Sequence, residues 1–316
     1  MRKFMLACAF VLFSCGLHEI IPLDAMTEEK MVSALQEALV LGSQTAAKNL
    51  GNSTCEMKEC VTGYLGNKLV EIALPDTVKN VLYQMDHFSQ KLEAAGFINA
   101  LNAINRLGFN TSGLMSEYLG IFEKGFDKYA DDIKTALNRG AEQAAPDAIG
   151  VFRDAIFGMS FGDAKGVLMG NSIAATSYLK TSTYAPLKVA FAPIIEEPLK
   201  LLNPNQYWQP LASRYNKFAK SYSNFQKQIN SSSYLSSYSS ALEDLPYGDL
   251  PEDLSNALAT YATGKALDGL FLMVGRQESE LRADPWGTVS SLGSFISDGV
   301  GNLLSDVFGK AKDGLL

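Results

Sequence analysis

The stretch MSFGDAKGVLMGNSIAATSYLKTST, residues 159–183, combines glycines, an acid, a base and hydroxyl side chains, residue types that could cradle a phosphate. A Walker-type loop requires G-x-x-x-x-G-K-[ST] between a strand and a helix. Gly162 and Gly166 have a different spacing, and no lysine follows Gly166. Ser160 and Asp163 instead show the S-x-x-D spacing of a capping box, which satisfies free N–H groups at a helix start. The stretch is therefore predicted to begin and end helices rather than to bind phosphate.

General acid–base catalysis needs a carboxylate and a second titratable group in one site. The weak catalytic candidates are Asp154, Asp163, Lys165, Lys265 and Asp268, with Arg276 and Glu278 further along the C-terminal segment. The alternative is structural: Lys265–Asp268 at i,i+3 and Glu278–Arg282 at i,i+4 have the spacing of exposed ion pairs on a helix. Since the chain holds only two histidines, a Ser–His or Cys–His nucleophile is poorly supported.

Two cysteines that follow the N-terminal segment, Cys55 and Cys60 in CEMKEC, are expected to form a local disulfide in an oxidising compartment. The two histidines are His18 and His87, and two thiolates alone do not complete the four-ligand shell of a structural zinc site. We therefore expect neither a metal nor another cofactor.

Aromatic and basic residues alternate in NPNQYWQPLASRYNKFAK, residues 203–220. Such a mixture can stack bases or sugars, which makes Tyr207, Trp208 and Tyr215 possible binding residues. The alternative is that the aromatic side chains lie in the core and the cations face water.

The N-terminus, residues 1–15, has the pattern of a lipoprotein-type signal peptide. A basic pair precedes an apolar run, Phe4–Phe13, which is shorter than the roughly 20 residues that span a bilayer. The run ends in LFSC, which resembles the bacterial lipobox, so Cys15 is the predicted lipidation site. Ordinary cleavage after Gly16 is the alternative.

The composition limits the class of partner. The chain of 316 residues has 27 Lys and Arg against 34 Asp and Glu, a formal net charge of −7. An acidic chain repels nucleic-acid phosphates and anionic lipid surfaces, so nucleic-acid binding is not expected. A hydrophobic content of 47% with 19% charged residues is typical of a globular protein.

We predict a tether at 16–26 and a single, mostly α-helical domain at 27–316, an irregular multi-helix bundle broken by Gly and Pro. At most one short strand or hairpin is expected, near 69–74, where apolar and β-branched residues precede Pro75. Residues 221–256 are predicted to form a Ser/Tyr-rich loop.

Inside the bundle, Thr181 to Thr183 are predicted to cap a new helix with Pro186 in its first turn. Pro193 and Pro198 are predicted to kink or break the segment that follows. The tail carries apolar residues at helical spacing, among them Phe295, Val300 and Leu303, and is predicted to dock on the body.

Four blocks together resemble a bacterial family of exported proteins, the domain-of-unknown-function family numbered 4197. They are GYLGNKLVEIALPDTVK (63–79), LNRGAEQAAPDAIGVFRDAIFGMSFGDAKGVLMGNSIAATSYLKTST (137–183), FAPIIEEPLKLLNPNQYW (191–208) and YATGKALDGLFLMVGRQESELRADP (261–285). The chain departs from the family at the cysteines, at the Ser/Tyr-rich loop and at an insertion-like stretch near 86–125. The resemblance implies an architecture and export, but no activity and no site residues.

The favoured hypothesis is a non-catalytic binding or interaction module, held at the membrane by lipid on Cys15, whose partner is an envelope protein or an apolar ligand. Gly16 after the cysteine suits a periplasm-facing outer-membrane lipoprotein, and a soluble periplasmic or secreted protein is the alternative. A hydrolytic enzyme that uses carboxylate and lysine side chains is the first competing hypothesis. A purely structural, self-associating envelope protein is the second.

Overall fold

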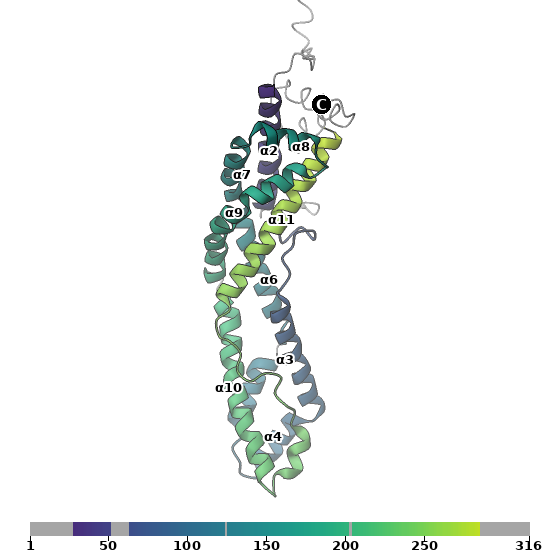
Figure 1. The fold of residues 1–316 in the computed structure, drawn as a ribbon. Helices are drawn as coiled ribbons and strands as arrows, with labels where there is room; N and C mark the ends of the chain where they lie inside the picture. Colours follow the sequence, from purple (N-terminus) through teal and green to yellow (C-terminus); the bar gives the residue numbers. More distant parts are fainter. Residues whose placement is uncertain (1–27, 52–62, 124, 202–203, 285–316) are drawn as a thin grey trace, which may run out of the picture. The chain divides into compact units, whose positions relative to one another are not determined.

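The computed structural model describes residues 28–51, 63–123, 125–201 and 204–284, and all regular structure in these ranges is helical (Figure 1). The predicted mostly α-helical class is therefore confirmed. The helices are α2 (Glu28–Gly51), α3 (Asp76–Ala94), α4 (Phe97–Arg106), α5 (Ser112–Phe122), α6 (Asp127–Ala144), η2 (Ala145–Asp147), α7 (Ala148–Phe157), α8 (Phe161–Met169), α9 (Ala174–Leu201), α10 (Pro204–Ser231), η3 (Ser236–Ala241) and α11 (Ser255–Ala283).

The chain divides into two compact units, each assembled from segments that are distant in the sequence. The first unit comprises Met1–Gly63, Ala145–Ala190 and Leu267–Leu316, and the second comprises Tyr64–Ala144 and Phe191–Ala266. Helices α9 and α11 each supply residues to both units. The single domain at 27–316 stays a prediction, because compactness alone does not test whether either unit folds by itself.

The first unit is built around helix α2, which packs against α7, η2 and α8. Its buried side chains recur every three to four residues, so that one face of the helix is apolar. The buried apolar residues of α2 are Leu35, Ala38, Leu39, Ala46, Ala47 and Leu50. Elsewhere in this unit, Phe152 of α7 meets Phe271 of α11 edge to face, with ring centroids 5.7 Å apart.

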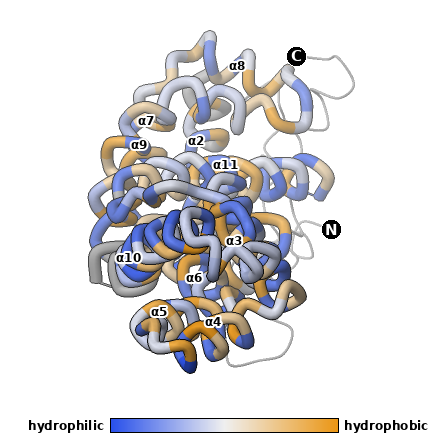
Figure 2. Tube along the Cα trace, turned by 90° about the horizontal axis from the view of Figure 1, so that it is seen from below, coloured by the Kyte–Doolittle hydropathy of each residue, from blue (hydrophilic) through white to orange (hydrophobic). Residues whose placement is uncertain are grey.

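The second unit has a core of interlocking aromatic rings. Phe88, Phe97, Tyr118, Phe122, Phe218 and Tyr222 are buried and contact one another, mostly edge to face. Four of these six rings come from the insertion-like stretch 86–125, which forms the end of α3 and all of α4 and α5. Apolar and hydrophilic positions alternate along α4 and α5 (Figure 2), because each helix turns one face to this core.

The segment predicted as a possible strand, 69–74, begins as a turn and continues as extended chain, and it pairs with no strand among the described residues. Asn138 of α6 takes the place of a strand partner. Its side-chain Oδ1 accepts the N–H of Ile72 at 2.8 Å, and its Nδ2 donates to the carbonyl of Ile72 at 2.8 Å. One buried amide thus satisfies the backbone groups that a sheet ladder would otherwise have paired.

Helix α9 corrects the prediction of a new helix capped by Thr181 to Thr183, because it runs without a break from Ala174 to Leu201. Each of the three hydroxyls bonds a carbonyl four residues earlier in the same helix instead of capping a new one, as Thr181 does to Ser177 at 3.0 Å. Pro193 and Pro198 also lie within this helix and do not end it.

The predicted Ser/Tyr-rich loop is shorter than 221–256, because α10 continues to Ser231 and η3 follows. What remains is an extended strap, residues 242–254, lying along α10. Three α10 side chains each bond both the N–H and the C=O of one strap residue: Tyr222 with Glu243, Tyr215 with Tyr247, and Asn216 with Leu250. The polar low-complexity sequence therefore follows a defined path.

Candidate functional site

A groove of about 690 Å³ lies between α9 and α11 in the first unit. Its apolar lining includes Ile173, Phe271 and Leu272, of which Ile173 and Leu272 are 45% and 46% exposed. Ligand pockets in proteins have volumes of this order and combine apolar walls with a few polar groups. The groove is therefore the candidate binding site of the described chain.

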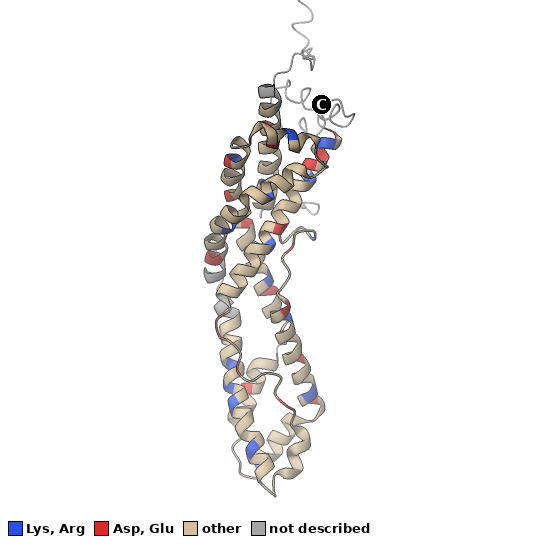
Figure 3. Cartoon of the chain, viewed as in Figure 1, with Lys and Arg blue, Asp and Glu red and all other residues tan. Residues whose placement is uncertain are grey.

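Polar side chains line both ends of the groove. At one end Lys180 lies 3.8 Å from Asp268, and its Nζ lies 5.8 Å from the centre of the Phe271 ring. At the other end Arg276 and Glu280 line the wall. Charges of both signs are thus interspersed along this part of α11 (Figure 3), so the site combines an apolar middle with polar ends.

Gly275 allows the two helices to approach closely at the floor of the groove. A Cβ atom built on it would lie 3.6 Å from side-chain atoms of Ile173 and Thr176 on the α9 side. That distance is ordinary van der Waals contact, so alanine would just fit while a larger side chain would have to displace α9. The width of the groove therefore depends on a small residue at this position.

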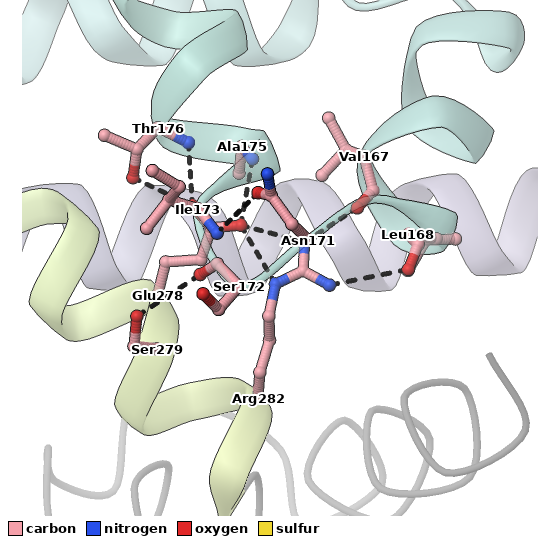
Figure 4. A network of polar contacts seen from close by, with 10 residues as sticks. All are labelled: Val167, Leu168, Asn171, Ser172, Ile173, Ala175, Thr176, Glu278, Ser279 and Arg282. Atoms are coloured by element: carbon pink, nitrogen blue, oxygen red, sulfur yellow. Dashed lines mark hydrogen bonds and ion pairs between the residues drawn. The ribbon is translucent and has the colours of Figure 1, made fainter. Parts of the chain in front are cut away.

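Glu278, on α11, caps the N-terminus of α9 from a distant part of the sequence. Its carboxylate accepts the N–H of Ala175 at 2.9 Å, the N–H of Thr176 at 2.7 Å and the Thr176 hydroxyl at 2.8 Å (Figure 4). These N–H groups have no partner inside their own helix, and the positive end of the helix dipole favours a negative charge there.

Arg282 lies one turn further along α11 and binds the C-terminal end of α8. Its guanidinium donates to the carbonyls of Val167 at 2.7 Å and Leu168 at 3.4 Å, in the last turn of α8. It also pairs with Glu278, at 2.8 Å between Nη2 and Oε1. One ion pair thus holds the end of α8 and the start of α9 on α11, with the intervening turn at Asn171 between them (Figure 4).

The Glu278–Arg282 pair corrects the prediction of an exposed ion pair. The i,i+4 pair is formed, but the two side chains are only 4% and 13% exposed. The physical reason is that both charges have further partners on α8 and α9, which cover them. Their role in this structure is to position the α9 wall of the groove.

The three central catalytic candidates, Asp154, Asp163 and Lys165, are all exposed. Asp163 forms the capping box with Ser160: the Ser160 hydroxyl accepts the N–H of Asp163 at 3.2 Å, and Asp163 accepts the N–H of Ser160 at 3.1 Å. The hydrogen bonds from Ser160 lower the pKa of Asp163. No hydrogen bond or ion pair joins these three to a second acid or base in the part of the chain that is described.

The C-terminal candidates also fail to form one cluster. Lys265 belongs to the second unit and lies 5.9 Å from the ring centre of Tyr261 in the same helix. Asp268 belongs to the first unit, where it faces Lys180 rather than Lys265. Of the catalytic candidates, Asp268 and Arg276 line the groove, and the groove residues on α9 were not predicted at all.

Residues 158–162, GMSFG, have the G-x-S-x-G spelling of a serine nucleophile elbow, so the expectation that the sequence lacks this pattern was wrong. An elbow places its serine between a strand and a helix, next to a histidine. Here helix α7 precedes Ser160, whose hydroxyl is engaged with Asp163 at 2.6 Å. His87, the histidine among the described residues, belongs to the other unit and is exposed. The structural context of an elbow is therefore missing.

Two of the possible binding aromatics, Trp208 and Tyr215, are buried. The indole Nε1 of Trp208 donates to the carbonyl of Pro251 at 2.7 Å, and Tyr215 holds the strap at Tyr247. The side chain of Tyr207 lies outside the described residues. In this structure the two buried rings stabilise the second unit.

Several predictions fall on residues that the structure does not describe: the signal peptide 1–15 with Cys15, the tether 16–26, the Cys55–Cys60 disulfide and the C-terminal tail. Within the described ranges, no three His, Cys, Asp or Glu side chains are grouped so as to hold a metal ion. Among the described helices, none is both long and apolar enough to cross a bilayer.

A family model described as "Protein of unknown function (DUF4197)" matches residues 25–108 and 115–295. The chain belongs to this family. The stretch predicted to be insertion-like, 86–125, is mostly matched by the family model, which leaves only 109–114 unmatched, so the predicted departure over the whole stretch was wrong. All groove residues and the Glu278–Arg282 pair fall within the DUF4197 match. No curated protein and no solved structure matches the chain significantly.

Proposed function

We propose that this DUF4197 protein is a non-catalytic binding protein of the cell envelope, and that the groove between α9 and α11 holds an apolar ligand. The observation that carries the proposal is the groove itself, with half-exposed Ile173 and Leu272 in its wall and charged side chains at its ends. Burying such apolar surface stabilises a complex by about 25 cal/mol per Å².

The side chains that line the described part of the groove support binding rather than turnover. In the described part of the groove the titratable side chains are Lys180, Asp268, Arg276 and Glu280. Lys180 and Asp268 are about half exposed and 3.8 Å apart, which is the geometry of a weak surface ion pair. Such a pair can select the polar end of a ligand.

The envelope location rests on the N-terminal sequence, where the basic start, the short apolar run and LFSC indicate export and lipid attachment at Cys15. In washed membranes of a Gram-negative host, we expect the wild-type chain to be retained and the Cys15→Ala chain to be released in folded form. Retention of Cys15→Ala would reject the anchor while leaving the groove untouched.

Ligand binding is tested with the neutral apolar probe N-phenyl-1-naphthylamine, whose fluorescence rises in an apolar site. Leu272→Glu should weaken probe binding at least about tenfold, because it places a charge on the apolar wall. The matched control is Val189→Glu, on the same unit but outside the groove, where the side chain is 77% exposed. Equal binding by both variants would reject the groove as the site.

Native mass spectrometry of protein purified from the envelope identifies the ligand class. A defined extra mass that is lost on denaturation, and absent from Leu272→Glu, supports an apolar small molecule. A clean apo mass together with a crosslinked envelope protein at Leu272 would replace the small ligand by a protein partner.

A further inference from the structure

The charged side chains on the described wall of the groove differ in whether they have a partner. Lys180 and Asp268 lie 3.8 Å apart. The Oε2 of Glu280 accepts a hydrogen bond from Nε2 of Gln277 at 3.1 Å. Arg276 forms no hydrogen bond and no ion pair with any residue that the structure describes. Its guanidinium is therefore the charge on this wall that a ligand can engage without breaking an existing contact.

Arg276 lies one helical turn from the apolar middle of the groove. Leu272 precedes it by four residues, so the two side chains are neighbours on one face of α11. Gly275, the residue before Arg276, faces Ile173 on the α9 side, from which a Cβ atom would lie 3.6 Å away. A hydrocarbon chain that covers Ile173 and Leu272 therefore has this cation within one turn, about 5 Å along α11.

The two cations of the groove differ in what they offer an anion. The charge of Lys180 is already balanced by Asp268, and its Nζ also lies 5.8 Å from the centre of the Phe271 ring. The guanidinium of Arg276 is a planar fork of donors, which matches the paired oxygens of a carboxylate or a phosphate. An anionic head group at Arg276 thus gains charge-assisted hydrogen bonds, whereas a cationic one would be repelled.

We propose that the ligand of the groove is an amphiphile with one acyl chain and an anionic carboxylate or phosphate head group. The chain covers Ile173 and Leu272, and Arg276 binds the head group. The volume of about 690 Å³ is that of a small-molecule site, which suits a single chain. This inference rests on the proposed function and adds the chemical class of the ligand.

The first test compares probes that share a twelve-carbon chain and differ in the head group: dodecanoate, dodecyl phosphate, dodecanol and dodecyltrimethylammonium. Binding is measured by displacement of N-phenyl-1-naphthylamine and by isothermal titration calorimetry. At least one anionic probe should bind at least about tenfold more tightly than dodecanol, because hydrogen bonds to a charged group are stronger than neutral ones. The tighter of the two anions identifies the head group. Equal binding of all four probes, or tightest binding of the cationic probe, would overturn the proposal.

The second test assigns the preference for an anion to one residue. The ratio of anion affinity to dodecanol affinity is measured within each variant, so that a general loss of binding cannot imitate a loss of selectivity. We expect the ratio to fall to about one in Arg276→Gln and to return in part in Arg276→Lys, which keeps the charge but not the fork. The matched control is Arg153→Gln, an exposed arginine of the same unit outside the groove, which should keep the wild-type ratio. A wild-type ratio in Arg276→Gln, or loss of the ratio in Lys180→Gln instead, would overturn the proposal.

The outcomes separate this inference from the proposed function. If the neutral probe binds and is lost in Leu272→Glu, but dodecanoate, dodecyl phosphate and dodecanol bind equally, the groove is a binding site and only the anionic head group is rejected. If neither the neutral probe nor any twelve-carbon compound binds the wild-type chain, the ligand-binding proposal itself fails.

Discussion

Replacing Arg282 by methionine tests the claim that one buried ion pair holds two helix termini on α11. The change keeps the length and much of the volume of the side chain but removes the charge. It leaves the Glu278 carboxylate without its ion-pair partner and removes the donors to the carbonyls of Val167 and Leu168. The perturbation therefore acts on charge and hydrogen bonding rather than on packing.

The expected cost follows from burial. Removing one partner of a buried ion pair leaves an uncompensated charge and typically lowers the free energy of unfolding by about 3–5 kcal/mol. Glu278 retains its three bonds from Ala175 and Thr176, which places the expected loss at the lower end, about 3 kcal/mol. In Glu278→Gln with Arg282→Met no buried charge remains, so the double variant should lose about 1–3 kcal/mol less than the sum of the single variants.

Urea denaturation followed by far-UV circular dichroism measures these differences. Arg276→Met is the matched control, since Arg276 is exposed on the same helix and forms no ion pair with any described residue; its expected effect is within about 0.5 kcal/mol. If Arg282→Met lowers the free energy of unfolding no more than Arg276→Met does, the pair does not hold the two helices. The same conclusion follows if the effects of Glu278→Gln and Arg282→Met add up to that of the double variant within about 0.5 kcal/mol.

Further predictions address packing and pH. Gly140→Ala should destabilise the chain by about 1 kcal/mol, because its Cβ would lie 3.2 Å from the carbonyl oxygen of Ile195. Gly264→Ala, with open space around it in α11, should stabilise by about 0.5–1 kcal/mol, and an equal effect of both in thermal melts would contradict this. Burial raises the pKa of Tyr215 to about 12, so the folded chain keeps this proton at a pH where the unfolded chain loses it. Stability should therefore fall from about pH 10 to pH 12, and the fall should be smaller in Tyr215→Phe when urea midpoints are compared. The bonds from Ser160 lower the pKa of Asp163, so the contribution of this cap is present above the ordinary carboxyl pKa and lost as the pH falls through the lowered one. Ser160→Ala should return the Asp163 pKa toward its ordinary value in an NMR titration, and an unchanged value would reject the capping interaction.

Local sequence patterns predicted the features whose energetics are local. The capping box of Ser160 with Asp163 and the i,i+4 pairing of Glu278 with Arg282 both depend on residues within a few positions of one another. These features follow from the sequence because neighbouring residues supply every partner involved.

Other features were decided by residues that lie far along the chain. Thr181 to Thr183 look like caps in isolation, but the tertiary structure supplies a cap earlier, at Ala175 and Thr176, from Glu278. The segment 69–74 has strand composition, yet Asn138, 66 residues from Ile72, satisfies its backbone. In each case the deciding partner lies far along the chain, where spacing rules carry no information.

The sequence by itself therefore determined the helical class and the family, because these depend on composition, periodicity and ordered local blocks. Only the tertiary structure decided that Glu278 and Arg282 are buried caps and that Ile173 and Leu272 face one groove. The physical reason is that burial and groove geometry arise when α8, α9 and α11 pack together. No single helix sequence specifies which partner covers it.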